Sequence, residues 1–141
     1  MDAMNATPAP LEPTLPLAES SLEALAVSHY EQVYAVCHAF SDDPSVCLGL
    51  ANQAFRETAG TPCLVSVSAN LAHLLSGRPG IELPVPRHTL LGNLAWLLKE
   101  VMRLNYTDIG AALGMEAGQV KHEIAAVRET VLSLVSAQPA C

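Results

Sequence analysis

The sequence is poor in positive charge and in aromatic side chains. Seven Lys and Arg residues stand against fourteen Asp and Glu residues, which gives a formal net charge of -7. An autonomous DNA-binding domain usually carries a basic surface, so strong DNA binding by this chain alone is not expected. Aromatic residues make up only 4% of the chain, so the stacking platforms that hold single-stranded nucleic acid are scarce.

Long apolar runs and paired cysteines are also missing. No apolar run reaches the roughly 20 residues needed to span a bilayer, which predicts a soluble protein without membrane insertion. The four cysteines lack the short paired spacings of a zinc site and no secretory segment precedes them, so we expect a reduced, cytoplasmic setting with no metal or other cofactor. Cys37 and Cys63 fall among apolar residues at helical spacing, where a thiol acts as a small core hydrophobe.

The chain does have abundant apolar residues at helical spacing. Half of its 141 residues are hydrophobic, enough to bury a core. From Ser21 an apolar stripe with three- and four-residue spacing predicts a first helix that ends before Asp42. Asp43 as cap and Pro44 in the first turn predict a second helix to about Glu57. A capping residue followed by proline occurs again at Thr61 and Pro62 and predicts the start of a third helix. This helix would bury Leu64, Val67, Leu71 and Leu74.

The predicted fold class is all-α, with two small helical domains joined by a Pro/Gly-rich linker. Residues 1–20 are proline-rich and acidic and are predicted to be a disordered tail. A three-helix domain is expected at 21–75 and a second helical domain at 88–135, followed by a tail at 136–141. The linker is placed at 76–87 because glycine and proline are dense there, at Gly77, Pro79, Gly80, Pro84 and Pro86.

The second domain contains the pattern of a helix-turn-helix between Tyr106 and Arg128, in which Thr107 is predicted to cap the first helix. Ile109 and Leu113 would face inward on the first helix, Gly110 is small where two helices approach, and Gly114 supplies the positive backbone angle of the turn. Val120 would begin the buried stripe of the second helix. An ordinary helical hairpin ending in glycine is the alternative that this pattern leaves open.

The segment LLKEVMRLNYTDIGAALGMEAGQVKHEIAAVRETV resembles the fourth conserved region of bacterial RNA polymerase sigma factors, most closely those of the extracytoplasmic function group. The matching residues are Tyr106, Thr107, Val120 and Lys121. HYEQVYAVCHAFSDDPSVCLGLANQAFRE is similar to the second conserved region of the family, and CLVSVSANLAHLL resembles the helix that follows it. The resemblance covers roughly residues 22 to 135 and implies a divergent member.

The resemblance implies where DNA and protein partners would bind. Base edges and phosphates would be contacted by the last helix, at Gln119, Lys121, His122 and Arg128. A protein partner would be contacted by the second helix, at Leu50, Asn52, Gln53 and Arg56. Glu123, Ala125 and Ala126 stand where the family usually has Arg or His, which predicts weak binding of promoter DNA.

Two functions follow from these features. One is a sigma-like regulator of transcription initiation that acts with RNA polymerase and promoter DNA. The alternative is a sigma mimic that binds an anti-sigma factor or a partner sigma protein and hardly touches DNA. Neither an enzyme nor a small-molecule substrate is expected, because the histidines are scattered and the acids mostly lie at helix ends; the histidines are His29, His38, His73, His88 and His122.

Overall fold

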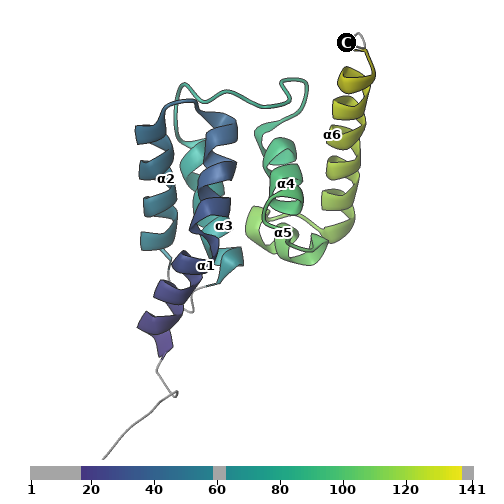
Figure 1. Ribbon diagram of the computed structural model, residues 1–141. Helices are drawn as coiled ribbons and strands as arrows, with labels where there is room; N and C mark the ends of the chain where they lie inside the picture. Colours follow the sequence, from purple (N-terminus) through teal and green to yellow (C-terminus); the bar gives the residue numbers. More distant parts are fainter. Residues whose placement is uncertain (1–16, 59–62, 138–141) are drawn as a thin grey trace, which may run out of the picture.

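A computed structural model describes residues 17–58 and 63–137, and within them the protein is built of helices alone. Six are present: α1 (Leu17–Phe40), α2 (Pro44–Arg56), α3 (Leu64–Ser76), α4 (Leu90–Glu100), α5 (Tyr106–Leu113) and α6 (Ala117–Ala137). Figure 1 shows α1 to α3 grouped on one side and α4 to α6 on the other. The predicted all-α class is confirmed. Of these helices, none is both long and apolar enough to cross a membrane.

The start of α2 agrees with the sequence prediction. The carboxylate of Asp43 accepts the backbone N–H of Ser45 at 2.9 Å, and Pro44 occupies the first turn. Proline is tolerated there because the first-turn amides have no partner within the helix. The local signal alone therefore determined this boundary.

Other helix starts differ from their predictions. Cys63 is the N-cap of α3 and is exposed, so its predicted burial as a core hydrophobe is wrong, and α3 begins at Leu64 rather than at Pro62. Thr61 and Pro62 lie outside the described residues. Helix α5 is capped by Asn105, whose side chain accepts the N–H of Asp108 at 2.8 Å, and not by Thr107. Asparagine is at least as good a cap as threonine.

The ends of the long helices also differ. Helix α1 begins at Leu17, inside the segment predicted to be a tail, and α6 continues to Ala137. The rest of the two predicted tails, 1–16 and 138–141, lies outside the described residues.

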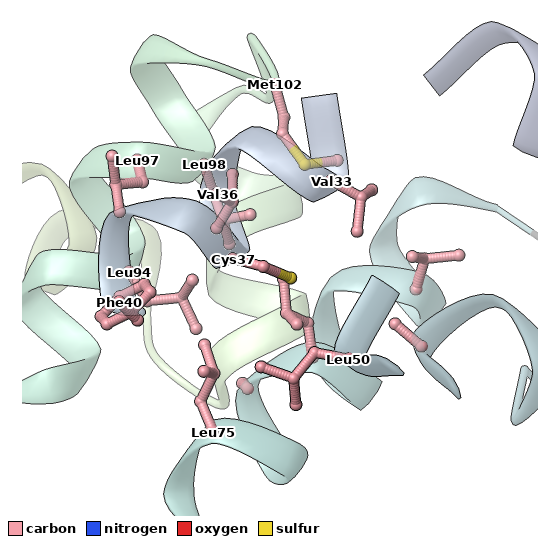
Figure 2. Close-up of a cluster of buried hydrophobic side chains, with 14 of the residues drawn as sticks. Val33, Val36, Cys37, Phe40, Leu50, Leu75, Leu94, Leu97, Leu98 and Met102 are labelled. Carbon is pink, nitrogen blue, oxygen red and sulfur yellow. The ribbon is translucent and has the colours of Figure 1, made fainter. Parts of the chain in front are cut away.

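One hydrophobic core draws on helices from both sides of the 76–87 segment. Val33, Val36 and Phe40 of α1 are fully buried in the same cluster as Leu94 and Leu98 of α4. In Figure 2, Phe40 and Leu94 lie together at one side of this cluster, and Val33 lies at the other side near Met102. Helix α3 also packs against α5 and, less extensively, against α4. The division into two domains stays a prediction, but the two groups of helices are packed together.

The 76–87 segment has no regular structure after Ser76, as predicted, yet it is fastened to the core. Val85 is 3% exposed, and the buried side-chain amide of Asn93 forms two hydrogen bonds with its backbone. The Asn93 Oδ1 accepts the Val85 N–H at 2.7 Å, and Nδ2 donates to the Val85 carbonyl at 3.0 Å. The Glu82 N–H donates to the carbonyl of Phe40 at the end of α1. These bonds hold the segment to both groups of helices.

Candidate functional site

A tight turn joins α5 to α6. Gly114 has a φ of 72°, and its N–H donates to the carbonyl of Gly110. The Met115 N–H donates to the same carbonyl at 2.9 Å, and a Cβ on Gly110 would overlap the Met115 carbonyl oxygen. The predicted roles of both glycines are confirmed: one adopts a left-handed conformation and the other permits a close approach.

The buried stripe of α6 fixes which side of the helix faces solvent. Val120, Ile124 and Val127 are buried against α4 and α5. Their spacing of four and three residues puts them on one face of the helix. Gln119, Lys121, His122 and Ala125 are all exposed, so the first half of α6 presents an open surface on its other side.

Arg128, the fourth candidate for DNA contact, is exposed but already paired. Its guanidinium forms an ion pair and a hydrogen bond with the carboxylate of Glu100 at the end of α4. Both side chains are more than 40% exposed, so the pair contributes at most about 1 kcal/mol to stability. The structure thus brings Gln119, Lys121 and His122 together and places Arg128 against α4.

Glu123 lies against α4 instead of among the exposed residues. It is half-buried, and a Cβ on Gly92 would lie 3.1 Å from its Oε1 and 3.3 Å from the Thr89 hydroxyl. The carboxylate therefore sits beside the first turn of α4, where the helix dipole favours a negative charge. Glu123 is thus not part of the exposed surface formed by Gln119, Lys121 and His122.

Tyr106 opens α5 and is half-buried. The Lys99 ammonium lies 4.8 Å from the centre of its ring, within the range of a cation–π contact. Lys99 is therefore also engaged within the fold. This contact links the end of α4 to the start of α5.

The partner-binding candidates of α2 do not share one surface. Leu50 is 3% exposed and belongs to the core, which leaves little of its side chain for a partner, and its predicted role stays a prediction. A resemblance between segments does not say which face of a helix is buried. Gln53 is half-buried and donates to Glu57 at 2.7 Å, whereas Asn52 and Arg56 are exposed.

Asn52 and Arg56 line a groove between α1 and α2. Tyr30 stacks on Phe55 with ring centres 6.0 Å apart, and its hydroxyl donates to the Asn52 amide oxygen at 2.8 Å. Burial raises the pKa of Tyr30, so the hydroxyl remains a donor. The groove has a volume of about 430 Å³ and is lined by Leu22, Glu23, Ala26, Tyr30, Asn52, Phe55 and Arg56.

Sequence reasoning missed Tyr30 and Phe55 as parts of a surface. They lie on different helices, and no spacing rule predicts that two distant aromatic residues will meet. The apolar stripe of the first helix was the only available signal, and Tyr30 lies at its edge.

Cys63 is the one cysteine in the described segments that is accessible to reagents. Hydrogen bonds from the Ser66 hydroxyl and the Ser66 N–H lower its pKa, whereas burial raises the pKa of Cys37 to about 12. In a Cys141→Ser background, iodoacetamide should alkylate Cys63 quickly and spare the two buried thiols. The rate should level off at a lower pH than for a free cysteine, because the thiolate forms earlier.

The measurement is mass spectrometry of the alkylated protein over a pH series. Ser66→Ala should move the pH at which the rate levels off upward, because it removes the largest cause of the lowered pKa. Alkylation of Cys37 or Cys47 at a comparable rate in the folded protein would contradict the buried positions of these thiols.

Comparisons with protein-family models, with curated proteins and with solved structures found no match to this chain. Within 17–58 and 63–137, no group of three or more His, Cys, Asp or Glu side chains is arranged to hold a metal ion. The function is therefore inferred from two surfaces, the exposed side of α6 and the groove between α1 and α2.

Proposed function

We propose that the protein is a sigma-like regulator of transcription initiation, in which α5 and α6 form a helix-turn-helix and α6 reads promoter DNA. The observation that carries the proposal is the open first half of α6, where Gln119, Lys121 and His122 are exposed beside a buried apolar stripe. In helix-turn-helix proteins the early residues of the second helix contact base edges in the major groove. The close turn at Gly110 and Gly114 supports the same assignment.

The charges of this surface make the proposed DNA contact weak. Lys121 is the only Lys or Arg in the first half of α6, and Arg128 is paired with Glu100. DNA affinity falls with salt according to the number of phosphates neutralised. With one or two such contacts, binding should be detectable mainly at low salt or with the help of RNA polymerase.

A sigma mimic is the second candidate, and the groove of α1 and α2 favours it. Its stacked aromatic pair and its exposed Asn52 and Arg56 suit a protein partner better than a nucleic acid, because Arg56 is its only cation. The net charge of -7 also favours a protein partner over a nucleic acid, because DNA repels a negatively charged protein. The partner of such a mimic would be an anti-sigma factor or a partner sigma protein.

Two charge reversals separate these functions. Lys121→Glu and Arg56→Glu each change the net charge by -2, from -7 to -9, so they are matched in overall electrostatics. If α6 reads DNA, Lys121→Glu should reduce the affinity for random-sequence duplexes at least tenfold at about 50 mM salt and lower the salt slope by about one. Arg56→Glu should leave both quantities nearly unchanged.

The measurements are fluorescence anisotropy with labelled DNA and a pull-down with core RNA polymerase and with candidate sigma and anti-sigma proteins. The mimic would remain as the function if the unmodified chain binds no DNA and if Arg56→Glu, but not Lys121→Glu, fails to capture the partner. If the unmodified protein and Lys121→Glu bind DNA equally well, the proposal that α6 contacts DNA is wrong.

A further inference from the structure

The groove between α1 and α2 has apolar walls. Leu22, Ala26 and Tyr30 are half-buried and follow one another at four-residue spacing, so they form one ridge along α1. Phe55 of α2 is 6% exposed and stacks against the Tyr30 ring. The ridge is about 12 Å long, at a rise of about 1.5 Å for each helical residue. An extended chain of about four residues spans that length.

Hydrogen-bond donors stand at the rim of this groove. Asn52 and Arg56 are exposed there, and the Asn52 amide oxygen accepts the Tyr30 hydroxyl. The Asn52 Nδ2 and the Arg56 guanidinium are both donors. A chain in the polyproline II conformation has no internal hydrogen bonds, so its carbonyls need such donors. Proline-rich segments bind aromatic-lined grooves, because their conformation is largely formed before binding. The groove therefore fits a proline-rich segment.

The sixteen residues before α1 contain such a segment. Pro10, Pro13 and Pro16 recur at every third position, which is the period of a polyproline II helix. The same stretch has two acidic side chains, Asp2 and Glu12, and no Lys or Arg. Glu12 lies between two of the prolines. A chain that places these prolines against an apolar ridge therefore also brings a carboxylate to the rim.

The connection to α1 is short enough for this segment to reach the groove. Helix α1 begins at Leu17, five residues before Leu22, so the ridge begins about 8 Å along the helix from that point. A reversal of the chain over residues 14–17 would return residues 10–13 along the ridge, antiparallel to α1. These four residues match the length of the ridge.

The charges of the segment and of the groove meet at the same end. Helices α1 and α2 are joined by three residues and pack together, so they run antiparallel. Arg56, the last residue of α2, therefore lies toward the start of α1, which is the end that Glu12 reaches first. Glu23 is the acidic residue of the groove and lies on the opposite wall, on α1. Its repulsion directs the carboxylate of Glu12 to the Arg56 side.

We propose that residues 10–13 occupy this groove in the same chain, with the prolines against the ridge of α1 and Glu12 paired with Arg56. The tether gives the segment an effective concentration on the order of 1 mM, so a contact with a Kd on the order of 100 μM keeps it bound in most molecules. A partner protein must displace the segment to reach Tyr30 and Asn52. This contact goes beyond the proposed function and does not depend on DNA binding by α6.

A synthetic peptide of residues 7–16 tests whether the groove is filled by the chain's own segment. It is titrated into the full chain with Pro10→Ala and Pro13→Ala, and the NMR signal of the Asn52 side-chain amide reports binding. This double variant should bind the peptide about tenfold more tightly than the unmodified protein, whose own segment competes. Pro8→Ala is the matched control and should bind the peptide as weakly as the unmodified protein.

A charge exchange tests the position of Glu12. Arg56→Glu, added to the double proline variant, should weaken binding of the peptide about fivefold, because an exposed ion pair is replaced by two like charges. A peptide with Glu12→Lys should recover the lost affinity on this variant. Failure of the second peptide to recover it would show that Glu12 does not pair with Arg56.

Two further results would overturn the proposal. One is a peptide that binds the unmodified protein and the double proline variant equally well, or that binds neither with a Kd below about 10 mM. The other is competition that increases with protein concentration from about 50 μM to 1 mM, which would place the segment in the groove of a second copy. No DNA is present in these titrations, so a failure here leaves the proposed contact of α6 with DNA unaffected.

Discussion

Asn93→Ala is expected to lower the free energy of unfolding by about 3 kcal/mol, because the Val85 N–H loses its partner in a buried site. The amide is fully buried and also donates to the carbonyls of His88 and Thr89, so alanine leaves an empty polar space as well. Urea denaturation followed by circular dichroism measures the effect. The segment that follows α3 should become accessible to proteases in the same variant.

Asn70→Ala is the control for Asn93. Asn70 also donates to backbone, at the carbonyl of Ala54, but it is only half-buried. Water can replace that bond, so a loss of about 1 kcal/mol is expected. Equal losses for the two variants would contradict the special role of the buried amide.

Gly110→Ala should destabilise the protein by about 3 kcal/mol, since the new Cβ would meet the backbone of Met115 and force α5 and α6 apart. Alanine is the better helix former by about 1 kcal/mol, so the steric cost must exceed this gain. The same urea experiment measures the change. Because α6 carries the proposed reading surface, DNA affinity at low salt should fall as well.

Gly49→Ala provides a control of opposite sign. Gly49 lies inside α2 with open space around the position of a Cβ. The same substitution there should raise the stability by about 0.5 to 1 kcal/mol, because alanine lowers the entropy of the unfolded chain. If both glycine variants gained stability, the close approach of α5 and α6 would be disproved.

Local signals predicted the helices and the turn glycines well. The cap at Asp43 and the positive φ at Gly114 depend on a few adjacent residues, and both are found as expected. Competition between neighbouring caps was harder to predict: Asn105 stands two residues before Thr107, and each is a suitable cap. A local pattern that offers two suitable caps does not say which of them the helix uses.

Contacts between distant residues could not be predicted. In the sequence Asn93 is a polar residue within a leucine-rich helix. Its hydrogen bonds to Val85 become visible only in the folded structure, where the 76–87 segment runs beside α4. The half-buried position of Glu123 beside Gly92 is of the same kind, because residues 31 positions apart in the sequence meet there. In the candidate site, the exposure of Gln119, Lys121 and His122 followed from the helical period, whereas the pairing of Arg128 with Glu100 did not.

The shared core has a consequence for the synthesis of the protein on the ribosome. Helices α1 to α3 leave the ribosome before α4, which supplies Leu94 and Leu98 to the cluster around Val36 and Phe40. Until α4 emerges, the nascent chain exposes this apolar face, and exposed faces of this kind favour aggregation and chaperone binding. A translational arrest before Leu90 would therefore release a fragment prone to aggregate, whereas an arrest after Ile124 would release one that holds every buried residue of the cluster.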